Sequence, residues 1–195
     1  QSVLDDALER HAATIGPALQ GSLLVDIAAA LEQSGQPEAA RAQLGEALRV
    51  LGQAPAEDRT RALDALLALA RSHLKARDLA KAREVLAMAH EEGERRNTAT
   101  ARIDVLSVQA ALEQTEGNVD GAITVLLDAL AVAHAVDDEA AEGRIRQQQV
   151  RVLQQGGRLP DALAAARLAR SVAQRIAWDE GVSVAEQMVV SLEAR

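Results

Sequence analysis

Apolar and small residues recur at helical spacing along the chain, and the pattern returns about every forty residues. Four stretches align without gaps, over residues 35–48, 77–90, 117–130 and 157–170. The small residue that anchors each stretch is Ala40, Ala82, Ala122 and Ala162 in turn. Another small residue follows seven positions later, at Ala47, Ala89, Ala129 and Ala169. Because residues seven apart share one helical face, each stretch predicts a helix.

A second helix is expected before each of these, because a further small or modest residue recurs upstream. It is Ala28, Ala70, Ala110 and Val150 in turn. Antiparallel helices approach closely where side chains are small, so the repeating unit is a helical hairpin. We expect helices over 2–14, 19–34, 37–51, 58–76, 79–96, 99–116, 119–136, 138–156, 160–177 and 180–194. Pro37 and Pro160 fall in first turns, where a missing N–H is tolerated, and Pro17 and Pro55 are expected in linkers.

The repeats predict one domain over residues 1–195, with hairpins at about 19–54, 58–97, 99–136 and 138–177. The same register extends in both directions, so residues 1–16 and 180–195 each resemble half of a hairpin. Because solenoids normally end in capping helices, half hairpins indicate a fragment of a longer protein. The alternative is that these halves are the natural caps.

Composition supports helices packed through small side chains. The chain is 48% hydrophobic, with one Trp and neither Phe nor Tyr, and Ala and Leu are strong helix formers. The absence of Cys excludes disulfides and Cys-ligated zinc. A net charge of -8 argues against a nucleic-acid partner for this segment, and no apolar run reaches membrane-spanning length. With no signal peptide visible, we expect a cytoplasmic protein, and the Arg-rich, Lys-poor composition indicates a bacterial source.

This pattern resembles the tetratricopeptide repeat family. The matching positions are the small residues above and the turn glycines Gly35, Gly117 and Gly157. The resemblance implies an all-α fold, a right-handed superhelical solenoid of stacked antiparallel helical hairpins. Arg77 replaces one turn glycine, and each unit is about six residues longer than the standard repeat. The longer period resembles the extended repeats of bacterial signal-transducing regulators and of kinesin light chains.

Catalytic and metal-binding patterns are few. The chain has no phosphate-binding loop, no HExxH pair and no GxSxG motif. The acidic pairs at 137–139 and 179–180 are expected at helix starts, where carboxylates cap free N–H groups. The group of His90, Glu91 and Glu94 is interpreted as a solvated helix end. We therefore expect no enzyme activity, no cofactor and no metal.

The resemblance further implies that the first helix of each hairpin lines a concave groove. Residues at its groove-facing positions are the candidates for partner binding: Glu32, Gln33, Asp64, Arg71, Lys75, Gln114, Arg144, Gln147, Arg151 and Gln154. The basic members suit an acidic peptide, because arginine forms forked contacts with carboxylates. The alternative is that they are ordinary solvated side chains.

These observations favour a non-catalytic scaffold that binds a protein or peptide, with no membrane contact. Two further hypotheses stay open at this point. One is the sensor or oligomerisation region of a bacterial signal-transducing transcriptional regulator. The other is a homodimer formed through the open ends of the solenoid.

Overall fold

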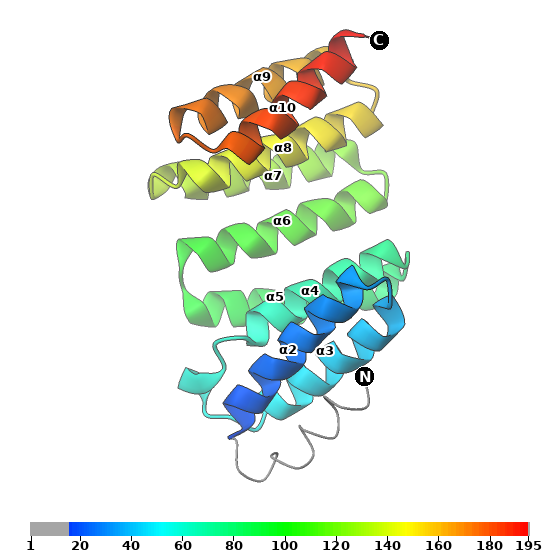
Figure 1. Ribbon diagram of the computed structural model, residues 1–195, viewed down its shortest axis with the longest axis vertical. Coiled ribbons are helices and arrows are strands. Elements are labelled where there is room, and N and C mark those ends of the chain that lie inside the picture. Colours follow the sequence, from blue (N-terminus) through cyan, green and yellow to red (C-terminus); the bar gives the residue numbers. More distant parts are fainter. Residues whose placement is uncertain (1–15, 195) are drawn as a thin grey trace. The chain divides into compact units, whose positions relative to one another are not determined.

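The computed structural model describes residues 16–194, which form α-helices joined by short turns (Figure 1). The helices are α2 (Pro17–Gln33), α3 (Pro37–Leu51), α4 (Ala62–Lys75), α5 (Leu79–Arg96), α6 (Ala99–Thr115), α7 (Val119–Ala135), α8 (Glu139–Gln155), α9 (Leu159–Arg175) and α10 (Asp179–Glu193). No strand occurs within 16–194, so the all-α fold class is confirmed. The helix expected over 2–14 lies outside the described residues, and the others end within four residues of the expected positions.

Two expected boundaries are wrong. Pro17 is the first residue of α2 instead of a linker residue, since its missing N–H would have no helical partner there. Helix α4 begins at Ala62 instead of 58, because Ala56–Asp58 form a separate 3₁₀ turn, η1. Arg59 closes this loop by donating from Nε to the carbonyl oxygen of Ala54 at 2.8 Å.

The chain divides into two compact units between Glu92 and Gly93, within helix α5. In the first unit, α2 and α3 form a hairpin, and α4 packs on α3. In the second unit, the hairpins α6–α7 and α8–α9 are followed by α10, and successive helices run antiparallel (Figure 1). Helices α6, α8 and α10 also contact one another in sequence, α6 with α8 and α8 with α10. We call these three the A helices, and α7 and α9 the B helices.

The small anchor residues predicted from the sequence form the inside of the helix crossings. All eight anchor alanines of the second helices are at most 1% exposed, and so are the four small residues of the first helices. In the second unit, Leu126 of α7 and Ile145 of α8 fill the space around these alanines. Protein interiors are close-packed, so a larger side chain at an anchor position has no room.

Each turn between consecutive described helices, apart from the α3–α4 loop, contains one residue with a left-handed backbone. These residues are Gly35, Arg77, Asn97, Gly117, Asp137, Gly157 and Ala177. From Arg77 onwards they lie twenty residues apart. At Asp137 and Ala177, as at the glycines, the following N–H bonds to the carbonyl five residues earlier, which is the Schellman ending of a helix. The same connection therefore serves both within and between hairpins.

Candidate interaction surface

The side of α8 that faces away from the B helices carries Arg144 and Arg151. They are seven residues apart and share one face of the helix, and both side chains are exposed. Neither guanidinium has a hydrogen-bond or ion-pair partner among residues 16–194. Surrounding protein atoms desolvate the guanidinium of Arg151 and lower its pKa from the ordinary value, although much of the side chain reaches solvent. This face thus presents two positive groups without counter-charges.

Gln147 does not lie on this face, which corrects its assignment to the groove. Its side chain is only 9% exposed, and its Nε2 donates to the carbonyl oxygen of Gly181 at 3.4 Å. Gln147 lies three residues after Arg144, so its side chain is rotated by about 60° from that of Arg144 around the helix axis and points toward α10. Gln154 is half-buried, and its side-chain amide has no partner in the described part of the chain.

Other glutamine side chains join α8 to α6. Gln114 Nε2 donates to Gln155 Oε1 at 2.9 Å, and Gln155 Nε2 donates to the carbonyl oxygen of Gln114 at 3.3 Å. Gln148 Nε2 donates to the carbonyl oxygen of Ser107 at 2.8 Å. Gln114, a candidate for partner binding, therefore already holds two A helices together.

In the first unit, two of the candidate positions form an ion pair with each other. Lys75 Nζ lies 2.9 Å from Glu32 Oε2, and the hydrogen bond from Lys75 lowers the pKa of Glu32 below its ordinary value. Asp64 is paired with Arg61 at 3.0 Å. The positive charge of Lys75 is therefore partly offset by Glu32, while its side chain remains exposed.

Four candidate residues of the first unit are exposed: Gln33 in the last turn of α2, and Asp64, Arg71 and Lys75 on α4. With Arg144 and Arg151 on α8, the exposed basic candidates thus lie in both units. On α4, Arg71 and Lys75 lie four residues apart, and Lys75 is paired with Glu32. On α8, Arg144 and Arg151 lie seven residues apart.

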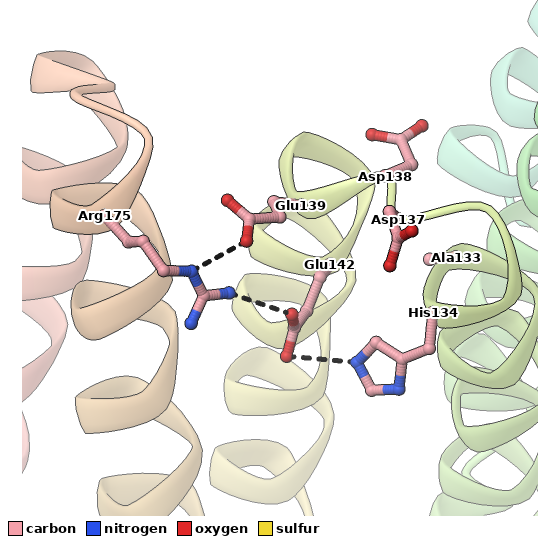
Figure 2. A pocket seen from close by; sticks show the side chains of 7 residues that line it. All are labelled: Ala133, His134, Asp137, Asp138, Glu139, Glu142 and Arg175. Carbon is pink, nitrogen blue, oxygen red and sulfur yellow. Dashed lines mark hydrogen bonds and ion pairs between the residues drawn. The ribbon is translucent and has the colours of Figure 1, made fainter.

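A polar cleft of about 240 Å³ lies where α7 ends and α8 begins. Figure 2 shows Arg175 reaching from α9 toward Glu139 and Glu142 of α8, while His134 approaches from α7. The cleft is lined by Ala133, His134, Asp137, Asp138, Glu139, Glu142 and Arg175. It is therefore built by three consecutive helices.

The carboxylate of Glu142 is at the centre of this cleft. Its Oε1 lies 3.3 Å from His134 Nε2, and its Oε2 lies 3.5 Å from Arg175 Nη2 (Figure 2). Burial raises the pKa of Glu142, but the hydrogen bond from His134 and the charge of Arg146 outweigh it, so that the pKa is below its ordinary value. Arg175 Nε also donates to Glu139 Oε1 at 2.8 Å. The cleft is a network in which ion pairs join α8 to α9 and the contact between His134 and Glu142 joins α7 to α8.

The sequence predicted the acidic residues here as helix caps, and Asp138 is one. Its Oδ1 accepts the N–H of Ala141 at 2.8 Å at the start of α8. The network around Glu142 was not predicted, because its members come from three helices and no local motif connects them. Within 16–194, no three His, Asp or Glu side chains are arranged to hold a metal ion. None of the described helices has the length and hydropathy needed to span a bilayer.

Two solved structures share this arrangement of helices. One is the signal transduction ATPase with numerous domains (STAND) protein with a tetratricopeptide repeat sensor from Pyrococcus horikoshii. It matches 90% of this chain with a TM-score of 0.74 at 17% identity. The other is aspartyl phosphate phosphatase F from Bacillus subtilis, which matches 93% of this chain with a TM-score of 0.78 at 11% identity.

The fold is a tetratricopeptide-like helical repeat. At these identities the likeness shows the fold alone. The chain spans 26% of the Pyrococcus chain and 47% of the Bacillus chain, so it corresponds to less than half of either protein. No family model and no curated protein sequence matches it.

Proposed function

We propose that this chain is a non-catalytic interaction module that binds a peptide, or a segment of another protein, along the exposed face of its A helices. The observation that carries this proposal is the pair of exposed guanidinium groups, Arg144 and Arg151, which have no partner within 16–194. Stacked helical hairpins present extended surfaces of this kind to their partners. The repeats of the Pyrococcus protein form a sensor, which supports a binding role for this fold.

Binding to this face needs little rearrangement of the protein. Buried alanines and side-chain hydrogen bonds, such as the one from Gln148 Nε2 to the carbonyl oxygen of Ser107, hold the A helices in place. The guanidinium groups are therefore attached to a well-packed helix. A preorganised surface loses less conformational entropy on binding than a flexible one. Arginine adds directional, charge-assisted hydrogen bonds to a carboxylate or carbonyl of the partner.

The alternative is a sensor region whose bound ligand changes the curvature of a larger regulator. The Pyrococcus protein, whose repeats are described as a sensor, favours this alternative at the level of fold. Small-angle scattering with and without a selected ligand separates the two. A module that only docks keeps its radius of gyration, whereas a sensor changes it.

The proposal is tested by selecting a random peptide library, displayed on phage, against the folded chain. Selected peptides are then titrated against wild type and the Arg144→Glu/Arg151→Glu double variant. The control is Arg158→Glu/Arg167→Glu, which makes the same change of charge at the N-cap of α9 and within α9, and which also removes the ion pairs of these arginines with Asp120, Asp161 and Glu193. Peptides that bind wild type and the control but not the double variant support the proposal. A library that yields no binder, or binders that do not distinguish the variants, contradicts it.

A further inference from the structure

The outward faces of the two B helices carry large apolar side chains that the fold leaves exposed. Leu127 on α7 is 53% exposed, and Leu168 on α9 is 49% exposed. The next exposed residues along each face are small: Thr124 and Ala131 on α7, and Ala164 and Ser171 on α9. Small residues along the middle of a helix face allow another helix to approach closely.

Leu127 lies on the flank of α7 that is turned toward α9. Asp120 precedes it by seven residues and therefore shares its side of the helix. The Oδ1 of Asp120 lies 3.1 Å from Nη1 of Arg158, which is the N-cap residue of α9. This ion pair fixes the direction of that side of α7.

Leu168 lies on the flank of α9 that is turned back toward α7. The residue before it, Arg167, points the other way, because its Nη2 lies 2.8 Å from Oε1 of Glu193 on α10. Consecutive residues are about 100° apart around a helix, so Leu168 lies on the opposite flank of the exposed face. The two leucines therefore lie on facing flanks of helices that both pack on α8.

The outer flanks of the same two faces carry opposite charges. Asp128 follows Leu127, lies on the flank of α7 turned away from α9, and has no ion-pair partner within 16–194. Arg167 occupies the outer flank of α9, and its side chain is 56% exposed. Its bond to Glu193 uses only Nη2, so its remaining N–H groups can still donate to an acceptor.

This pattern is self-complementary about a two-fold axis that runs between α7 and α9 and parallel to them. Such an axis places α7 of one copy against α9 of a second copy, with both helices running in the same direction. Leu127 then meets Leu168 of the second copy, and Asp128 meets Arg167 of the second copy. By symmetry each contact occurs twice, as in every isologous interface.

We infer that the exposed faces of α7 and α9 form a symmetric homodimer interface. Four leucines make its apolar centre, and two ion pairs between Asp128 and Arg167 make its rim, which is the usual arrangement of protein interfaces. Thr124 faces Ala164 of the second copy, and Ala131 faces Ser171, so the helices approach closely. The contact is small, so the dimer exchanges with monomer.

The inference does not depend on the proposed function, because the interface uses the B helices alone. Arg144 and Arg151 lie on the side of α8 that faces away from them, so a dimer presents that face twice. Each copy has a net charge of -8, and at physiological ionic strength this repulsion is screened over about 8 Å. The contacts between Asp128 and Arg167 are shorter than that distance and keep their attraction.

Sedimentation of the full chain measures self-association, from about 1 µM to about 1 mM, which spans weak specific binding. The wild type should form dimers and no larger species. Leu127→Gln/Leu168→Gln should raise the dissociation constant at least about tenfold, since it removes the apolar centre. The matched control is Leu19→Gln/Leu23→Gln, which changes two exposed leucines of α2 and should leave the dimer unchanged.

Charge reversal tests which residues meet. Asp128→Arg and Arg167→Asp each place like charges at both rim contacts, so each variant alone should dimerise at least about tenfold more weakly than wild type. In an equal mixture of the two variants both rim contacts again join opposite charges. The mixture should therefore form a heterodimer as tight as the wild-type dimer. Circular dichroism establishes that every variant is folded.

Four outcomes overturn the inference. They are a folded wild type that stays monomeric over the whole range, a dimer that the loss of Leu127 and Leu168 leaves unchanged, a dimer lost in the α2 control instead, and a mixture of the charge variants that does not recover association. None of them affects the proposed function, because binding of a selected peptide to α8 is measured separately.

Discussion

Replacement of Ala177 by glycine should stabilise the protein. Ala177 has φ of 53°, and its left-handed backbone allows the N–H of Trp178 to bond to the carbonyl oxygen of Ala173 at 2.9 Å. The left-handed conformation costs a residue with a Cβ roughly 1–2 kcal/mol. Glycine avoids that cost, but its greater freedom in the unfolded chain offsets roughly 0.4–1 kcal/mol. The net expectation for Ala177→Gly is about 0.5–1 kcal/mol of added stability.

Thermal and urea denaturation followed by far-ultraviolet circular dichroism measures this effect. The melting temperature should rise by roughly 1–4 °C. Two matched variants should instead lower the stability of the protein. Ala164→Gly changes an exposed position inside α9 and should cost about 1 kcal/mol. Gly157→Ala, at φ of 72°, should also destabilise. If Ala177→Gly lowers the denaturation midpoint as Ala164→Gly does, Ala177 does not have a left-handed backbone. The recurrence of a left-handed turn residue every twenty positions is then refuted.

Three further predictions concern packing and charge. Ala122 has no exposed surface, so Ala122→Leu should overpack the helix crossing and lower the free energy of unfolding by roughly 1–3 kcal/mol in urea denaturation. Gln114→Ala should lower it by less than about 1 kcal/mol. Equal effects of the two variants would contradict the helix register. A double-mutant cycle on Glu32 and Lys75 should give a coupling of roughly 0.2–1 kcal/mol that falls with added salt, and a salt-independent value would contradict a surface ion pair. The pKa of Glu142 is lowered by folding, so its ionised form adds stability above the pKa of an unfolded glutamate, and this stability disappears as pH falls through the folded value. Glu142→Gln should therefore lower the melting temperature at neutral pH and lose this effect in acid, and a difference that persists in acid would contradict the assignment.

The repeat could be predicted because it depends on local chemistry. Only small side chains fit where helices cross, so alanines such as Ala122 and Ala162 recur at a fixed spacing and mark the crossings directly. Gly117 and Gly157 mark the turns inside the hairpins because their backbones are left-handed, a conformation that glycine adopts without strain. The turns between hairpins were harder to recognise. Asp137 and Ala177 adopt the same left-handed backbone, but neither residue type indicates it.

The site was predicted only in part, because exposure on a helix depends on its neighbours. The spacing of Arg144 and Arg151 puts them on one face of a helix, and the family resemblance predicted that this face is exposed. Gln147 lies close to the same face, yet α10 covers it, and a difference of one position in the register decides between solvent and core. The pairing of Lys75 with Glu32 joins two helices, and the spacing of residues within one helix carries no information about it.

The most direct test of the account locates a bound peptide on the protein. A peptide selected from the library is synthesised with a photo-reactive benzophenone side chain, crosslinked to the folded chain, and mapped by mass spectrometry. The account predicts crosslinks on α8, within residues 144–155, that disappear in the Arg144→Glu/Arg151→Glu variant. Crosslinks confined to the B helices α7 and α9, or unchanged in that variant, would contradict it.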